Sequence, residues 1–472
     1  MENARICEDA QLRGCIAGRN SVIESGAQMF EESVAGSFSR VGNRAMMMQG
    51  VKLWPRKALP EGERPEENIV WGAKCGHRFI AARLQAGDPA QAARLLRGAI
   101  AEMKISEIII GRASSSVSDA MQRAAIAGAM AQGIQVYDAG ITSLPQLRHM
   151  QRHLHAVCAA HVDENGIMIL DRSGAILSER MQRSILKTIE RQDYSDAFSG
   201  ITKPVKQTGG ALSYIAETAA MFRANAAYLP AILLICENNH ILALAEESFV
   251  RAGLRVRTEA NPDIARPYDD EITVRISPDG GKAYVSNQNN SMDDIRRELM
   301  CAWTLMKSDE KQLILPLNAT RAIDSLCDSA AYIPGDMAAW HTAMAKKSVA
   351  QFAVQLDGIA AALYFLSALV CKGLSLDEWF GSIPSACRSY RRVSIPAKQS
   401  GAALKKLFEN RLDAQFGGGI RLPGKDGWAF LSPDDVQPEM CIMAEAGRYE
   451  TADELCFFYA KQLEELAAKS ND

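Results

Sequence analysis

The stretch VCAAHVDENGIMI, from Val157 to Ile169, is the first place in the chain where chemically active residue types gather. It holds His161 and Asp163, and either side chain can in principle carry a phosphoryl group. The residue before the histidine is Ala160, which offers no nucleophilic oxygen. Alternatively, His161 orders a loop by hydrogen bonding, and Asp163 is a turn residue before Asn-Gly. The stretch is therefore either an active site with an unusual nucleophile or a site that has lost its nucleophile.

Histidines in the segment RHMQRHLH form a second candidate site. His149 and His153 are four residues apart, so a helix places them on one face, where two imidazoles can bind zinc. His155 is close by, but the sequence offers no evident third protein ligand. The alternative is a set of solvated helix histidines without a metal.

A basic cluster in CRSYRRVSIP contains Arg388, Arg391 and Arg392. Guanidinium groups recognise phosphate and carboxylate, so the cluster could bind an anion. We favour the alternative, a solvated linker that leads into a last domain.

Composition bounds the class of protein. The chain has 472 residues, 47% hydrophobic and 23% charged, which is typical of a globular protein of several domains. A net charge of −3 predicts no nucleic-acid or membrane partner, and no signal peptide or long apolar run is recognisable. The eleven cysteines lack a C-x-x-C pair, and Cys158, Cys236 and Cys301 lie in apolar segments. A reducing cytoplasm is the expected compartment.

A period of six residues opens the chain. The apolar positions are Ala17, Ile23, Met29, Ala35, Val41 and Met47. Small residues follow the first five of them at a fixed distance, namely Ser21, Ala27, Ser33, Ser39 and Ala45. A linker would not hold one phase over so many units, so we expect short strands in a β-helix.

After Gly72 the pattern changes to alternating helix and strand. The first expected elements are helix, strand, helix, strand and helix over Gln85–Met103, Ile105–Arg112, Asp119–Gln132, Gly133–Gly140 and Pro145–His155. The alternation recurs over Leu212–Val256 and Lys311–Val370, which predicts mostly parallel sheets. In Arg421–Leu466, the segments GWAFLSP and EMCIMAEA indicate an antiparallel pair before a final helix.

The run EIIIGRASSSVSDAMQRAAIAGAMAQGIQVYDAGITSLP resembles the first domain of the α-D-phosphohexomutases, the phosphomannomutases and phosphoglucomutases. VQLDGIAAALYFLSALVCKGLSLDEWFGSIP and KDGWAFLSPDDVQPEMCIMAEA resemble their third and fourth domains. The opening repeat resembles the left-handed β-helix of sugar-nucleotide pyrophosphorylases. The order of parts resembles the fused mannose-1-phosphate guanylyltransferase/phosphomannomutase-like proteins without the transferase.

This resemblance implies an α/β chain that begins with a left-handed β-helix of hexapeptide repeats. Three α/β mutase-type domains with mixed, mostly parallel sheets would follow, and then a C-terminal α+β domain. The implied boundaries are 1–70, 71–205, 206–308, 309–395 and 396–472.

The resemblance also implies where the nucleophile and the metal would lie. The phosphoserine loop T-A-S-H-N-P corresponds to Cys158–Asp163, with Ala160 at the serine position. The Mg²⁺ loop D-G-D-x-D-R corresponds to Pro267–Ile272, where Asp269 and Glu271 remain as a remnant that could hold Mg²⁺. The alternative for these two carboxylates is a solvated loop before a strand.

The phosphate clamp R-P-S-G-T-E-P corresponds to the segment that begins SPDDVQP. Its arginine is gone, and the segment now offers Ser432, Asp434, Asp435 and Gln437. Two carboxylates at that place would repel a phosphate dianion.

Other loops depart from the family pattern as well. G-R-D-T-R-x-S-S corresponds to Gly111–Ser118 and keeps Arg112 as a substrate-binding candidate. F-G-T-S-G-I-R-G corresponds loosely to Trp71–Arg78, and no G-E-x-S-G-H motif lies between Trp340 and Asp357. The helices and strands between these loops remain well patterned, which indicates a folded protein kept for another role.

We therefore expect a catalytically impaired phosphohexomutase-like protein, a scaffold, regulator or weak sugar-phosphate binder in sugar-nucleotide metabolism. The alternative is a divergent, Mg²⁺-dependent mutase that interconverts hexose 1- and 6-phosphates. The resemblance implies a homo-oligomer or a hetero-complex formed through the β-helix, with a nucleotidyltransferase or an active mutase as partner.

Overall fold

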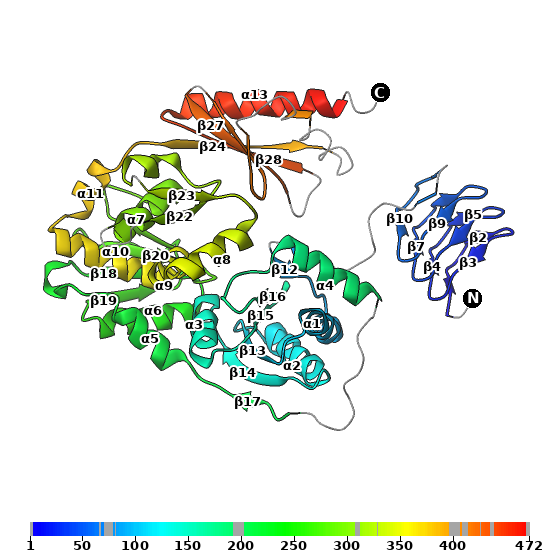
Figure 1. Ribbon diagram of the computed structural model, residues 1–472, viewed down its shortest axis with the longest axis horizontal. Helices are drawn as coiled ribbons and strands as arrows, with labels where there is room; N and C mark the ends of the chain where they lie inside the picture. Colours follow the sequence, from blue (N-terminus) through cyan, green and yellow to red (C-terminus); the bar gives the residue numbers. More distant parts are fainter. Residues whose placement is uncertain are drawn as a thin grey trace. The chain divides into compact units, whose positions relative to one another are not determined.

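The structure is a computed structural model, and it divides the chain into two compact units, Met1–Arg78 and Phe79–Asp472 (Figure 1). It describes residues 3–65, 68–69, 79–80, 82–191, 203–306, 312–327, 329–395, 406–407, 414–424, 426–434 and 439–468. The segment Trp71–Arg78, which we matched to a family loop, lies outside the described residues.

The first unit consists of three sheets of parallel two-residue strands. Each strand pairs with the third strand along the chain, as Val22 does with Arg40. Ile23, Met29, Val41 and Met47 are buried, as the six-residue spacing predicts. The strands are β1 (Arg5–Ile6), β2 (Gln11–Leu12), β3 (Ile16–Ala17), β4 (Val22–Ile23), β5 (Gln28–Met29), β6 (Val34–Ala35), β7 (Arg40–Val41), β8 (Met46–Met47), β9 (Lys52–Leu53) and β10 (Ala58–Leu59).

The second unit opens with a seven-stranded sheet in the order β11-β12-β16-β15-β13-β14-β17. Its strands are β11 (Phe79–Ile80), β12 (Arg83–Leu84), β13 (Glu107–Arg112), β14 (Gln135–Ile141), β15 (Ala159–Asp163), β16 (Gly166–Leu170) and β17 (Lys206–Gln207). Its helices are α1 (Pro89–Met103), α2 (Ser116–Met130), α3 (Leu144–Leu154) and α4 (Glu179–Arg191). The expected alternation is confirmed here, with ends shifted by a few residues.

A four-stranded sheet in the order β19-β18-β20-β21 follows, and its β20–β21 pair is antiparallel. Its strands are β18 (Ile232–Ile235), β19 (Val256–Glu259), β20 (Ile272–Ile276) and β21 (Ala283–Ser286), with helices α5 (Ala211–Ala219), α6 (Asn239–Arg251) and α7 (Asp294–Met306). The parallel pair β22 (Leu313–Pro316) and β23 (Ala330–Ile333) comes next, with α8 (Met337–Lys347), α9 (Val349–Leu356), α10 (Gly358–Lys372) and α11 (Leu376–Ser382).

The last region is a five-stranded antiparallel sheet against which α13 (Tyr449–Ala468) packs (Figure 1). Its strands are β24 (Cys387–Ser394), β25 (Gln415–Phe416), β26 (Ile420–Pro423), β27 (Gly427–Pro433) and β28 (Glu439–Ala446). The expected antiparallel pair is β27–β28, and β24 also pairs with β28. This sheet therefore begins at Cys387, ahead of the expected boundary at 395/396.

Among the described residues, no single helix combines the length and apolarity that crossing a membrane requires. Helices α9 and α10 reach that threshold only when taken together, and they are bent by 108° at their junction.

Candidate functional site

The segment predicted to be the nucleophile loop is a strand instead. Ala159–Asp163 forms β15, and its whole length is buried between β13 on one side and β16 on the other. Only Glu164 and Asn165 separate β15 from β16, and Asp163 pairs with Gly166 across the turn. The prediction of a loop was wrong because Glu164 and Asn165 form a tight two-residue turn, and the residues on either side of it pair as strands.

The surroundings of Ala160 and His161 give both residues a role in the fold. Ala160 is fully buried in the apolar core around the seven-stranded sheet. His161 Nε2 donates to the Thr142 carbonyl oxygen at 2.9 Å, and burial lowers the pKa of the imidazole. The histidine is therefore neutral at pH 7 and ties β15 to the segment before α3.

The charged groups near the end of β15 pair with one another. Asp163 accepts from the Asn165 backbone N–H at 2.9 Å, as expected of a turn residue, and forms an ion pair with Arg83 at 2.7 Å. Arg112, the substrate-binding candidate at the end of β13, lies 3.1 Å from Asp119 on α2. Since parallel sheets bind ligands at the carboxyl ends of their strands, this edge is where a family ligand would be sought. At this edge, Arg83 and Arg112 are already paired with carboxylates of the chain itself.

The two carboxylates of the expected Mg²⁺ remnant have separate partners. Glu271 is buried and forms an ion pair with Arg257 at 2.7 Å, and hydrogen bonding to Arg257 lowers the pKa of Glu271. Asp269 accepts from the Gln288 side chain at 2.9 Å. Both residues precede β20, at the opposite end of that strand from the β20–β21 loop.

Part of the expected phosphate clamp is described. Ser432 lies at the end of β27, and Asp434 accepts a weak hydrogen bond from the Cys441 thiol and lies 3.9 Å from Arg392. Asp435 and Gln437 lie outside the described residues.

The basic cluster is not the solvated linker that we predicted, because it lies on β24. Arg388 is 6% exposed and donates to Glu445 at 2.9 Å and to Glu298 at 2.7 and 2.9 Å. Glu445 also accepts from the Thr320 hydroxyl and the Trp428 indole N–H, both at 3.0 Å. We call Arg388, Glu298, Glu445, Thr320 and Trp428 the Arg388 network.

A central cavity of about 480 Å³ adjoins the Arg388 network. The β20–β21 loop contributes Asp279 and Lys282 to its lining, and α7 contributes Arg297. Lys282 and Arg297 each lie 3.8 Å from Asp294, which also lines the cavity. Charged side chains therefore stand within a largely apolar lining, and Lys282 and Arg297 lie beside a carboxylate.

A second cavity of about 280 Å³ is lined by residues of α3, α5 and α9. We call it the α3–α5 cavity and define it by Arg148, His149, Tyr214, Glu217 and Asp357. The Tyr214 hydroxyl lies 3.0 and 2.9 Å from the two oxygens of Asp357. Burial raises the pKa of Asp357 to about 6, and it lowers the pKa of His149 to about 4.

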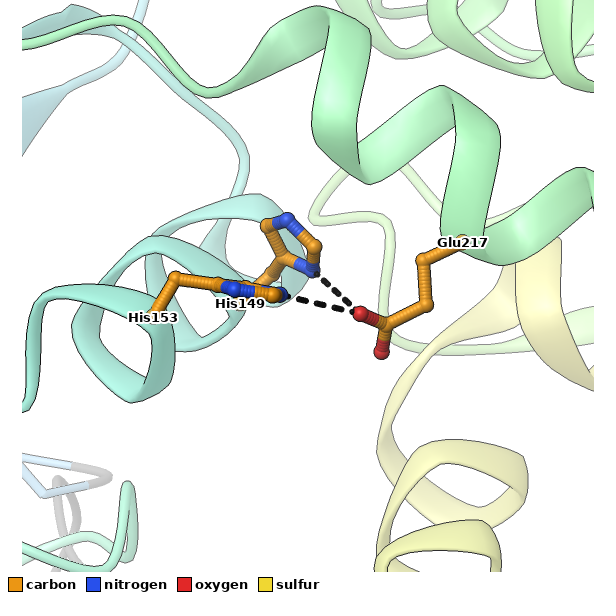
Figure 2. A group of neighbouring side chains, drawn as sticks. All are labelled: His149, His153 and Glu217. Carbon is orange, nitrogen blue, oxygen red and sulfur yellow. Dashed lines mark hydrogen bonds and ion pairs between the residues drawn. The ribbon is translucent and has the colours of Figure 1, made fainter.

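The structure adds a residue to the predicted histidine pair. Glu217 on α5 faces His149 and His153 on α3, with its Oε2 3.3 Å from His149 Nδ1 and 3.0 Å from His153 Nε2 (Figure 2). His155 follows the helix end and is not in this group. Sequence spacing found the two histidines, but no local pattern marks Glu217, which is 64 residues beyond His153.

Residues 77–196 match the family model for phosphoglucomutase/phosphomannomutase, alpha/beta/alpha domain I. A phosphoglucosamine mutase of Rhodococcus erythropolis is 27% identical over 173 residues, which is 33% of this chain and 37% of that protein. A protein of Pyrococcus abyssi named "probable phosphoglucosamine mutase" is 20% identical over 401 residues, which is 74% of this chain and 88% of that protein. This chain thus spans little more than a third of the length of the Rhodococcus relative.

Solved structures share the fold. A phosphoglucomutase/phosphomannomutase family protein of Burkholderia thailandensis superposes with a TM-score of 0.63 at 14% identity, covering 82% of this chain and 98% of that one. Parafusin, a phosphoglucomutase of Paramecium in its open form, gives a TM-score of 0.57 at 9% identity, covering 83% and 96%. The chain is therefore phosphohexomutase-like in fold, with a first α/β domain of the phosphoglucomutase/phosphomannomutase type.

Proposed function

We propose that this chain, which carries a phosphoglucomutase/phosphomannomutase-type first domain, is a catalytically inactive phosphohexomutase-like protein. It would act as a scaffold or regulator, or as a weak sugar-phosphate binder, in sugar-nucleotide metabolism. The observation that carries the proposal is the hairpin β15–β16, which occupies the place expected for the nucleophile loop. Ala160 supplies no hydroxyl and is buried in the core, so no phosphoserine can form there.

The charge arrangement supports the same proposal. Phosphoryl transfer requires a nucleophile, a metal ion or cations at the transferred group, and a clamp for the substrate phosphate. At the carboxyl edge of the first sheet, Arg83 and Arg112 pair with Asp163 and Asp119. A substrate phosphate would have to displace a carboxylate of the chain itself, which weakens binding and does not position the phosphate for transfer.

The central cavity supports weak sugar-phosphate binding. Its volume of about 480 Å³ falls within the range of small-molecule sites. Lys282 and Arg297 could face a phosphate, but each lies beside Asp294. We therefore expect binding without turnover, and a stronger dependence of that binding on salt than on the identity of the sugar.

For the first unit, we propose a left-handed β-helix of hexapeptide repeats that mediates assembly. Exposed apolar side chains support a role in association, because Ile6, Ile16, Phe38, Met48 and Trp54 are 40 to 54% exposed. The partner would be a second copy, a nucleotidyltransferase or an active mutase. The cysteines that the structure describes are free thiols, which suits the reducing cytoplasm that we propose as the compartment.

A divergent phosphohexomutase is the second candidate function. The observation that favours it is the naming of both sequence relatives as phosphoglucosamine mutases. In that case a Mg²⁺-dependent phosphotransferase would use His161 or Asp163 as the nucleophile. Both side chains already have partners, Thr142 and Arg83, which must be displaced first.

Turnover and intact mass together decide between the two candidates. Purified full-length protein is assayed with Mg²⁺ for interconversion of the 1- and 6-phosphates of glucosamine, glucose and mannose. It is also incubated with the hexose 1,6-bisphosphates and weighed by mass spectrometry. We expect no turnover and an unmodified mass. Turnover that His161→Asn or Asp163→Asn abolishes, or a single-phosphate adduct mapped to either residue, would establish the mutase instead.

A further inference from the structure

Three side chains converge beside the α3–α5 cavity, and two of them, His149 and Glu217, line it. His149 and His153 are one helical turn apart on α3, and Glu217 reaches toward them from α5 (Figure 2). Each of the three offers one ligand atom, and these atoms all lie within 4.8 Å of one another. The same Glu217 oxygen faces both imidazoles, at 3.3 and 3.0 Å.

This arrangement fits a tetrahedral metal ion. Zinc binds histidine nitrogen and carboxylate oxygen at about 2.0 to 2.2 Å, so two ligand atoms of one tetrahedral site lie roughly 3.3 Å apart. The two nitrogen–oxygen distances here are already close to that value. We propose that His149, His153 and Glu217 form a binding site for one divalent transition-metal ion, with Zn²⁺ as the best match.

The hydrogen bonds of His149 favour a cation between its Nδ1 and Glu217. Ser213 Oγ donates to the Gly210 carbonyl oxygen at 3.1 Å, so at 3.0 Å from His149 Nε2 it acts as an acceptor. A neutral His149 therefore carries its hydrogen on Nε2, and its Nδ1 lone pair faces the carboxylate of Glu217. Two acceptors at 3.3 Å repel each other unless a proton or a metal ion lies between them.

His149 is also held in place for such a role. Its side chain is 4% exposed, and its ring packs edge-on against Tyr214, with ring centroids 5.6 Å apart. Metal-binding histidines commonly donate their other ring N–H to a neighbouring group, which fixes the tautomer and the ring orientation. Ser213 has that position here.

Arg152 opposes the ion and also limits its affinity. Its guanidinium forms an ion pair with Glu217 Oε1, the oxygen that does not face the histidines. The pair keeps Glu217 ionised and oriented, but it places a positive charge next to the ion. With two neutral imidazoles, one carboxylate and one guanidinium, we expect affinity in the micromolar range, and tighter binding in Arg152→Gln.

Three protein ligands leave a fourth coordination position. His149 and Glu217 line the α3–α5 cavity, so the fourth position is open to water from that side. The ligands come from α3 and α5, which belong to consecutive sheets of the second unit. A bound ion would therefore link these two helices and stabilise the folded protein against heat.

The test is metal binding by the full-length, tag-free protein, measured with the metal alone. Calorimetry with Zn²⁺ is compared for wild type, His153→Ala, Glu217→Gln and the control His155→Asn, with Mg²⁺ as the control ion. His155 is a suitable control because it is near but outside the group, and its backbone at φ 52° tolerates Asn. Substitution with Co²⁺ then identifies the ligand type from its visible absorption.

We expect wild type and His155→Asn to bind one Zn²⁺ per chain, and His153→Ala and Glu217→Gln to bind Zn²⁺ at least tenfold more weakly. We expect no binding of Mg²⁺. Zn²⁺ should raise the melting temperature of wild type and His155→Asn but not of the other two variants. Co²⁺ bound to wild type should give d–d bands without a thiolate charge-transfer band. Equal Zn²⁺ binding by wild type and His153→Ala, a thiolate band, or no binding at all would overturn the proposal. The measurement uses no sugar phosphate, so its outcome is independent of the mutase question.

Discussion

The Arg388 network and the α3–α5 cavity both bury ionisable side chains, but they stabilise them in different ways. In the Arg388 network a guanidinium at 6% exposure meets two carboxylates, and Glu445 takes further hydrogen bonds from Thr320 and Trp428. In the α3–α5 cavity, Asp357 is held by a phenol and by backbone N–H groups, and its pKa rises to about 6. The first arrangement is satisfied and structural. The second keeps the capacity to take up a proton or an ion.

The largest loss of stability should come from disrupting the Arg388 network. Glu445→Ala leaves Arg388 buried with one carboxylate fewer and removes the acceptor for the Trp428 indole N–H. We expect a loss of about 3 to 5 kcal/mol in the free energy of unfolding. Urea unfolding followed by tryptophan fluorescence measures it.

The matched control is Glu439→Ala on the same strand. Glu439 is 30% exposed and lies 3.9 Å from Arg392, so its removal should change stability by no more than about 0.5 kcal/mol. If the two variants lose equal stability, the Arg388 network is not the structural element that the geometry indicates.

The next largest effect should be a pH dependence of stability that arises from Asp357 in the α3–α5 cavity. Asp357 has a folded-state pKa of about 6, raised by burial above the value of an unfolded aspartate. The folded state thus binds the proton more tightly, so stability falls as pH rises through the interval between the unfolded and folded pKa values. Between about pH 4 and about pH 8 this group should cost wild type roughly 2 to 3 kcal/mol.

Asp357→Asn removes this titration while keeping Oδ1, which accepts from both the Tyr214 hydroxyl and the Ala360 N–H. The difference in unfolding free energy between variant and wild type should therefore shift in favour of the variant by that amount from about pH 4 to about pH 8. The comparison of the two pH values cancels any packing change. A difference that does not vary with pH would show that Asp357 stays ionised over this range.

Periodic features of the fold were predictable, because burial imposes a period on the sequence. The six-residue apolar spacing of the first unit and the alternation over Gln85–His155 both correspond to observed elements. The hairpin was missed even though its signal was present. Asn-Gly between apolar runs is a strong hairpin signal, and the observed turn lies one residue earlier, at Glu164-Asn165. The match to a family loop led us to interpret this segment as a loop instead.

Contacts between distant segments were not predictable. Glu217 reaches His153 across 64 residues, and Glu298 reaches Arg388 across 90. Neither carboxylate has a neighbour in sequence that marks its role, because only the packing of α5 on α3 and of α7 near β24 brings the pairs together. We assigned Arg388 to a solvated linker because the sequence alone does not reveal that an arginine is buried. Its burial becomes evident only from its carboxylate partners in the structure.

The smallest effect concerns the β15–β16 hairpin and tests whether a nucleophile could be restored there. Like the Arg388 network, this position is buried and structural. Ala160→Ser adds the hydroxyl of the family nucleophile, but position 160 is fully buried among the apolar side chains of the first sheet. A hydroxyl without a partner there should cost about 1 to 3 kcal/mol. The control Ala90→Ser, at an exposed position of α1, should change stability by no more than about 0.5 kcal/mol. After incubation with hexose 1,6-bisphosphate, the mass of Ala160→Ser should remain unmodified, because the hydroxyl has no path to the sugar. A phosphoserine at position 160 would mean that β15 opens, and the hairpin would then be a closed form of the family loop.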